Sequence, residues 1–263
     1  MFTQKDSPQK LYEQSSGQKA PLGAMLVTRD GRVWRYAKAG AVDIPVGTVC
    51  QAPEQTANTW GRTSSVSGGA ANPGSGGVVG TNWFRVVTGS TQAASEFDDG
   101  YVAHVLSSGG AGFCMQVSTN SAYDSTSVAG TDVFTIDDFP VTIAAGTTRS
   151  GLLENPYAGV VITEAPPGKQ VVGVPQMDIT AGRYFWILQR GVGFVRRDGA
   201  LTEGLPVMPS DGTAGTVEAW TATVAVTGDP ETATITFGNM PIGTCAAYSS
   251  TFTAGAMVNL SIL

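Results

Sequence analysis

Short runs in which apolar and polar residues alternate recur along almost the whole chain, and this period-two pattern is typical of β-strands. In the run 32–38, Trp34 and Tyr36 occupy alternate positions, so one face of the predicted strand is aromatic. Turn residues separate the runs about every 8 to 12 positions, which favours a sandwich or barrel. No stretch after residue 20 has a helical stripe, and we predict an all-β fold of two small antiparallel β-sandwich or barrel units. The main strand-like segments lie at 25–28, 32–36, 48–51, 83–88, 100–107, 112–118, 131–147, 157–163, 170–180, 183–191, 192–204, 218–228, 232–238 and 257–263.

Two Asp-Gly pairs lie between strand-like runs, which is a strong signal for a β-hairpin. At Asp30-Gly31 we expect a type I′ turn, and Asp198-Gly199 repeats the same pattern. The segment 228–232, GDPET, separates two further alternating runs and predicts a third hairpin.

The chain divides by composition into an arm and two β domains. Residues 1–20 are polar and offer only Phe2, Leu11 and Tyr12 as anchors, so we expect either a frayed tail or a tether that orders on a neighbouring molecule. The first β domain spans 21–165 and contains a Gly/Ser-rich loop at 63–80 that reads as flexible and lacks the lysine of a phosphate-binding loop. A Pro-Pro-Gly break near residue 166 begins the second domain, 166–263.

Composition and charge exclude several classes of protein and of binding partner. With 34 glycines and only 14% charged residues the chain is no helical bundle, and 42% hydrophobic residues exclude a disordered protein. The net charge of −6 argues against nucleic acid, and the sequence has neither a secretory signal nor an apolar stretch of membrane-spanning length. The most basic stretch, Arg183 to Arg197, is interpreted as strands with solvent-facing arginines rather than as an RNA-binding surface.

Candidate catalytic groups are few. His104, the single histidine, lies between apolar neighbours on a predicted strand and is interpreted as structural rather than as a general base. Cys50, Cys114 and Cys245 are too far apart for a CxxC site and are expected to be buried free thiols. We therefore predict no cofactor and no metal.

Carboxylates cluster in SEFDDGY, with Glu96, Asp98 and Asp99, and in TIDDFP, with Asp137 and Asp138. Paired carboxylates serve glycosidases, and Asp-rich loops bind calcium. Asp-Asp-Gly is also the composition of a tight turn, because Asp bonds its own backbone. We favour the turn and keep calcium binding and hydrolysis as alternatives.

Three segments carry a resemblance to a known family. They are APLGAMLVTRDGRVWRYAKAGAVDIPVGTVCQAP at 20–53, SGLLENPYAGVVI at 150–162, and VVGVPQ through TVEAW at 171–220. Together they resemble structural proteins of tailed bacteriophages, of the capsid decoration (cement) or minor capsid type. Glycines and aromatics such as Gly31, Trp34, Gly159 and Trp186 recur in order.

The resemblance implies a protein of the virion surface that resides in the host cytoplasm during assembly and is not an enzyme. Its expected partners are the major capsid protein and itself, as a homotrimer or possibly a dimer. A tethering arm would bind the capsid through Phe2, Leu11 and Tyr12. An alternative is a carbohydrate- or host-binding β module on the virion, motivated by the five tryptophans Trp34, Trp60, Trp83, Trp186 and Trp220.

Overall fold

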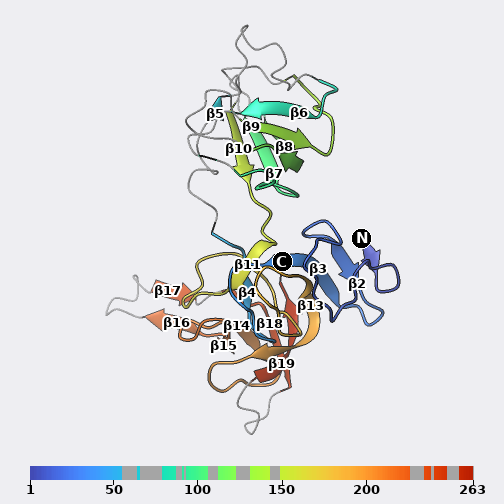
Figure 1. Cartoon of the computed structure of the whole chain (residues 1–263). Coiled ribbons are helices and arrows are strands. Elements are labelled where there is room, and N and C mark those ends of the chain that lie inside the picture. Colours follow the sequence, from blue (N-terminus) through green and yellow to red (C-terminus); the bar gives the residue numbers. More distant parts are fainter. Residues whose placement is uncertain are drawn as a thin grey trace. The chain divides into compact units, whose positions relative to one another are not determined.

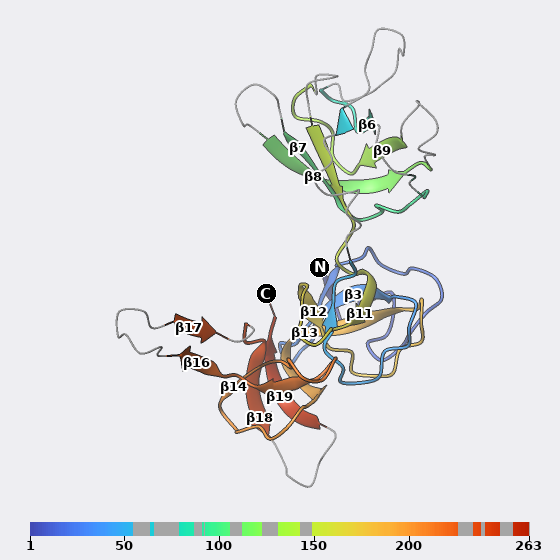
Figure 2. The ribbon, with the colours of Figure 1, turned by 90° about the vertical axis from the view of Figure 1, so that its left-hand side faces the viewer.

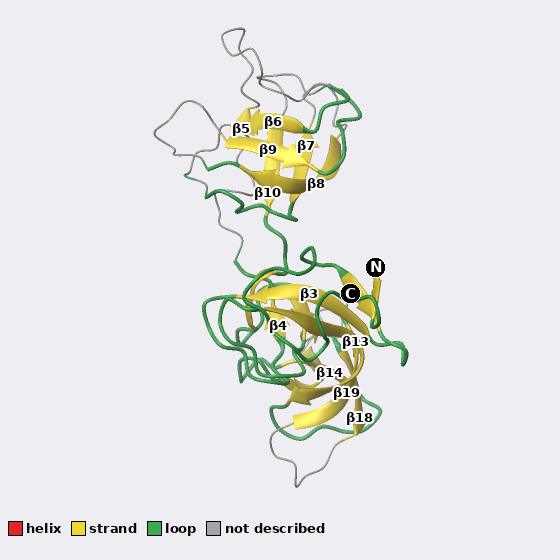
Figure 3. Ribbon diagram, turned by 45° about the vertical axis from the view of Figure 1, so that its right-hand side comes forward, coloured by secondary structure: helices red, strands yellow, loops and turns green. Residues whose placement is uncertain are grey.

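The computed structural model describes most of the chain, and Figure 1 shows it coloured along the sequence. Strands and loops make up the described part, with no helix in it (Figure 3). The prediction of an all-β protein with two sheet units is confirmed. Nor do the described segments include any helix long and apolar enough to cross a membrane. The described residues are 1–54, 64–65, 79–86, 91, 93–105, 112–122, 131–142, 149–225, 234–237, 240–247 and 255–262.

Two compact units share the chain, and one is inserted in the other. Unit 1 comprises Met1–Pro53 and Pro156–Leu263, and unit 2 comprises Glu54–Asn155. The predicted boundary near residue 165 is therefore wrong. The strands on either side of it, β11 (Ala158–Ile162) and β12 (Val171–Gly173), both pair with β4 (Cys50–Gln51) in one sheet.

Unit 1 is built on one curled sheet with the strand order β12-β4-β11-β3-β13-β19-β18-β14-β15. Strand β2 pairs with β3, and β1 pairs with β2. Most pairs are antiparallel, and the parallel ones are β1 with β2 and β3 with β11. The remaining bounds are β1 (Phe2–Thr3), β2 (Met25–Val27), β3 (Val33–Ala39), β13 (Tyr184–Arg196), β14 (Pro206–Pro209), β15 (Val217–Ala219), β18 (Gly243–Ala247) and β19 (Gly255–Ser261).

The predicted aromatic face of 32–38 is the inner face of this sheet. Trp34 and Tyr36 on β3 are fully buried, and Trp186 on β13 lies beside them. Alternate side chains of β19, Val258 and Leu260, complete the same core. Period-two alternation thus identified the buried side of these strands correctly.

Strand β13 is 13 residues long and serves two neighbours in turn. Its first half, up to Arg190, pairs with β3, and its second half, from Arg190, pairs with β19. Gly191, with φ of 100°, lies where the partner changes. A Cβ at that position would come within 2.6 Å of Cγ of Arg32, so only glycine permits the close approach.

Unit 2 is a smaller sheet with the order β5-β10-β7-β8-β9-β6. Its core includes the buried rings of Phe84, Phe97 and Phe139. On the other side of β6 and β9, Arg85 makes a two-point ion pair with Asp132, at 2.6 and 2.8 Å. The strands are β5 (Ser64–Ser65), β6 (Trp83–Val86), β7 (Tyr101–Val105), β8 (Gly112–Asn120), β9 (Thr131–Thr135) and β10 (Arg149–Leu153).

The first predicted hairpin is confirmed, but its turn type is wrong. Strands β2 and β3 pair antiparallel across Asp30-Gly31, and Gly31 has φ of 82°. The described non-glycine residues with positive φ do not include Asp30, so the turn is not type I′. Instead the amide of Gly31 donates to the carbonyl of Thr28, which is a type I turn closed by a left-handed glycine.

The Asp198-Gly199 pair forms a turn but not a hairpin. Strand β13 before it pairs with β3 and β19, and β14 after it pairs with β18 and β15, so the flanking strands are not neighbours. The carboxylate of Asp198 accepts a hydrogen bond from Ser210 instead. The third hairpin is confirmed: β16 (Ala222–Ala225) pairs antiparallel with β17 (Thr234–Phe237), and the two extend from the rest of unit 1 in Figure 2.

Two further sequence predictions have mixed outcomes. The Gly/Ser-rich loop at 63–80 lies outside the described residues, apart from the short strand β5 and residues 79–80. Cys50 and Cys245 are buried as expected, and burial raises the pKa of both thiols. Cys114 is exposed, because it points outward from β8.

The insertion predicts that the two units fold independently. Residues 54–155 expressed alone, and the remaining residues joined across the gap by a short Gly-Ser linker, should each give a dispersed amide NMR spectrum that overlays on a subset of the full-length spectrum. The reason is that β4 and β11 pair directly, so the linker has little distance to span. Amide spectra with poor dispersion from both fragments would show that the two units do not fold independently.

Candidate functional site: the N-terminal arm and its aromatic platform

Residues 1–20 are ordered against unit 1 rather than extended. Strand β1 pairs with β2, and Ser15 exchanges backbone hydrogen bonds with Tyr184. The ring of Phe2 meets Trp186 edge-on at 6.3 Å between centroids, and Leu11 is buried in the main core. The expectation of a free or partner-dependent arm is therefore corrected: the arm docks on its own sheet.

Gln9 is the polar anchor of the arm and is only 4% exposed. Its side-chain amide donates to the carbonyls of Glu13 and Tyr184, at 2.7 and 3.0 Å. Its side-chain oxygen accepts from the hydroxyls of Ser15 and Tyr36, at 2.7 and 2.8 Å. Four hydrogen bonds satisfy the amide completely, so a glutamine is held where an apolar residue would otherwise be expected.

An aromatic platform lies beneath this anchor. The indole nitrogen of Trp186 donates to the backbone carbonyl of Gln9, at 3.1 Å. Tyr36 stacks on Tyr184 at 6.1 Å and meets Trp186 edge-on at 5.0 Å. Burial raises the pKa of Tyr36, so its hydroxyl stays protonated and keeps donating to Gln9.

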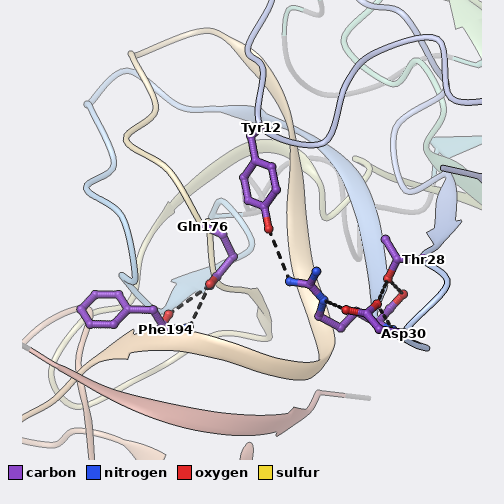
Figure 4. Close-up of polar contacts among 6 residues, drawn as sticks. Tyr12, Thr28, Asp30, Gln176 and Phe194 are labelled. Atoms are coloured by element: carbon purple, nitrogen blue, oxygen red, sulfur yellow. Dashed lines mark hydrogen bonds and ion pairs between the residues drawn. The ribbon is translucent and has the colours of Figure 1, made fainter. Parts of the chain in front are cut away.

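The outer end of the arm meets the β2–β3 hairpin, as Figure 4 shows. Tyr12 lies edge-on to Trp34, and its hydroxyl accepts a hydrogen bond from Arg32 at 3.4 Å. Arg32 also pairs with Asp30 at 2.7 Å and lies over the ring of Trp34. Thr28 donates a short hydrogen bond to Asp30, which lowers the pKa of that carboxyl and keeps it charged beside Arg32.

The structure thus brings together two groups of residues that sequence reasoning treated apart. Phe2 pairs with β2 and Tyr12 contacts Trp34 on β3, the two strands joined by the turn at Asp30 and Gly31, and Leu11 lies in the main core. Asp198 and Gly199 lie elsewhere in unit 1. Leu11 faces inward, and Tyr12, 57% exposed, is the anchor still open to a partner. Gln9 and Arg32 were missed because a polar residue in a polar segment gives no pattern signal.

His104 lies in the core of unit 2, as its neighbours in the sequence suggested. Its Nδ1 is 2.7 Å from the hydroxyl of Ser150, and the rings of Phe84, Phe113 and Phe139 surround it. Burial lowers the pKa of His104 to about 4, because a charged imidazolium would lose its hydration there. This environment suits a neutral, structural histidine.

The first acidic cluster forms a turn, as favoured from the sequence. Residues 94–99 are a turn in which Asp99 has φ of 59°, and its carbonyl accepts from Asn155. Glu96 caps the amide of Ala93 at 2.7 Å. Burial and the nearby Glu96 raise the pKa of Glu154. No group of three metal-ligating side chains occurs among the described residues.

The tryptophans divide between core and surface. Trp34 and Trp186 are fully buried, Trp83 and Trp220 are half-buried, and Trp60 lies outside the described residues. The two most enclosed indoles thus serve the core and the arm platform.

Comparisons with known proteins add no relative. No protein-family model, curated protein or solved structure matches the chain.

Replacing Gln9 by Ala should destabilise unit 1 by about 2–4 kcal/mol, because four partners, of which Tyr36 is fully buried, lose a hydrogen bond and a cavity opens. Urea unfolding followed by tryptophan fluorescence measures this free energy, since Trp186 lies directly beneath Gln9. The matched control is Gln4→Ala on the exposed part of the arm. Equal stability of the two variants would show that Gln9 does not anchor the arm.

Protonation of His104 predicts a pH-dependent stability of unit 2. The pKa is about 4 in the folded protein and about 6.5 when unfolded, so between these values the unfolded state binds more protons. The stabilisation is complete above pH 6.5 and falls by about 3 kcal/mol as the pH drops to 4. Urea titrations at several pH values should show this slope in the wild type and lose it in His104→Gln. An unchanged slope in the variant would assign the effect to other groups.

Proposed function

We propose that this protein is a structural virion protein: a capsid decoration or cement protein that binds the outer surface of a tailed-phage head and bridges neighbouring capsomers. Its partners in this proposal are the major capsid protein and further copies of itself, as a homotrimer or dimer. It acts at the virion surface and passes through the host cytoplasm during assembly. No catalysis, cofactor or nucleic acid is part of this role.

One observation carries the proposal. Of the three segments that resemble phage head proteins, 20–53 lies almost a hundred residues before 150–162 and 171–220, yet nearly all of their residues belong to unit 1. Unit 2 interrupts them as an insertion between β4 and β11. The segments that resemble phage head proteins therefore lie together in one compact unit, as expected if that unit shares its architecture with those proteins.

The arm enters the proposal in a modified form. Leu11 and Gln9 are buried within the protein's own sheet, so attachment through the whole arm would require undocking it. Tyr12 and Asp30 remain exposed at the outer end of the arm. In this proposal Tyr12 and Asp30 are the residues at this end of the arm that contact the capsid.

Five tryptophans motivated the alternative of a carbohydrate-binding module, and two of them, Trp34 and Trp186, are enclosed by the core. Sugar binding would need indole faces open to solvent, which these two do not offer, whereas Trp83 and Trp220 are half-buried. The neutral, buried His104 and the turn at Asp98-Asp99 likewise have structural roles. We therefore keep the decoration protein as the single proposal.

The proposal predicts a location that can be observed directly. Purified particles of the phage that encodes this chain should contain it in many copies by quantitative mass spectrometry. Electron cryomicroscopy of those particles should show it as repeated density on the outer face of the head. Heads stripped of it should release their DNA at a lower temperature, and adding back the purified protein should restore the original value.

Particles that lack the protein would refute the proposal, as would density restricted to the tail or to the inside of the head. An unrelated acidic protein of similar size is the control for the add-back, because it should leave the release temperature unchanged.

A further inference from the structure

The charge of the chain is concentrated in one unit. Of the 21 acidic and 15 basic residues, nine acidic and three basic residues lie in unit 2, which leaves twelve of each in unit 1. The whole net charge of −6 therefore belongs to unit 2. A surface of unit 1 that exposes arginine on strands without acidic residues has a complementary partner in another copy of the same chain.

Such a surface exists on the outer side of β13 and β19, and we name it the arginine face. It consists of Arg190, Val192 and Arg196 on β13 and of Met257 and Asn259 on β19. All five are exposed, and Val192 pairs with Asn259 across the two strands. Neither strand contains an acidic residue, nor does the adjoining β18.

Contacts of Phe194, which has the same parity on β13 as Val192 and Arg196, fix the arginine face. The ring of Phe194 lies against Gly47 and Gly255, where a Cβ would come within 2.6 and 2.4 Å of it. Gln176 accepts from the amide of Phe194 at 2.9 Å and donates to its carbonyl at 3.0 Å (Figure 4). This backbone is therefore ordered before any partner arrives, which lowers the entropy lost on binding.

Unit 2 carries a surface of matching chemistry, the acidic segment, at residues 134–141. Phe134, Ile136 and Val141 are 37%, 54% and 42% exposed, and Asp137 and Asp138 lie between them, also exposed. Like the arginine face, the acidic segment combines exposed apolar side chains with charges of a single sign.

The acidic segment is also ordered in advance. Phe139 within it is buried against Phe84 and His104, and its amide donates to the carbonyl of Thr81 at 2.7 Å. The amide of Ile136 donates to the carbonyl of Gln116 at 3.0 Å. The anchored phenylalanine leaves the flanking aspartates and apolar side chains pointing outward.

We infer that the acidic segment of one copy binds the arginine face of a second copy. Apolar side chains meet at the centre of this interface, and Arg190 and Arg196 face Asp137 and Asp138. The interface is heterologous, because it joins two different surfaces, so it generates a closed ring or a chain rather than a simple two-fold dimer. This inference specifies the self-association that the proposed function names, and because it concerns the free protein it does not depend on attachment to a phage head.

The contact is small and charged, which sets the expected behaviour. Each surface offers about five side chains, fewer than a standard interface has, so the association is weak and needs high protein concentration. Exposed ion pairs are screened by salt. The weight-average mass in sedimentation experiments should rise to at least about twice that of the monomer as the protein approaches 1 mM in about 0.02 M NaCl. It should return to the monomer value in about 0.5 M NaCl.

Charge reversal tests the pairing of the two surfaces. Arg190→Glu/Arg196→Glu and, separately, Asp137→Lys/Asp138→Lys should each abolish the rise in mass. Mixing the two variants should restore it, because each reversed surface then meets a complementary one. Lys5→Glu/Lys10→Glu makes the same charge change on the exposed arm and is the matched control that should still assemble.

Several outcomes would overturn the inference. They are a monomer mass at every concentration, assembly that survives both reversals, failure of the mixture to recover, and assembly that nuclease treatment removes. Thermal melts of each variant confirm folding, and recovery in the mixture is itself proof that both variants are folded. A failure here leaves the location of the protein on particles unaffected, so the two proposals are tested separately.

Discussion

The change of pairing partner along strand β13 is the constraint on which unit 1 depends. A single strand must pair first with β3 and then with β19, and the change of partner occurs at Gly191. The backbone there approaches Arg32 so closely that a side chain has no room. A glycine at such a position has no side chain to pack, but it permits the close approach of the backbone that a curled sheet requires.

The aromatic platform beneath the arm and the arginine face lie on the two halves of that strand. The first half presents Tyr184 and Trp186 to the N-terminal arm. The second half turns Arg190, Val192 and Arg196 toward solvent. Because the two halves pair with different strands, the first half of β13 supports the N-terminal arm and the second half presents a face that is open to a partner.

Within unit 1 the arm substitutes for part of the core. A polar segment of this composition would be expected to fray, yet a single fully satisfied glutamine and a few aromatic contacts hold it against the platform. Buried amides are stabilising only when every donor and acceptor is paired, which makes the geometry of Tyr36 and Ser15 as important as Gln9 itself. The arm is therefore ordered by specific polar contacts of Gln9 together with the apolar burial of Leu11.

The sequence by itself determined the all-β class, most strand positions, the inward direction of Trp34 and Tyr36, the hairpin at Asp30-Gly31 and the burial of His104 among apolar neighbours. These features depend on local alternation, on turn chemistry and on apolar neighbours, all of which are readable within a few residues. Only the tertiary structure decided that unit 2 is inserted between β4 and β11, that Asp198-Gly199 does not join neighbouring strands, and that Gln9 is buried. Strand order, insertion and the burial of a polar group depend on pairings between residues more than a hundred positions apart, and no local pattern encodes which distant strand or carbonyl will be the partner.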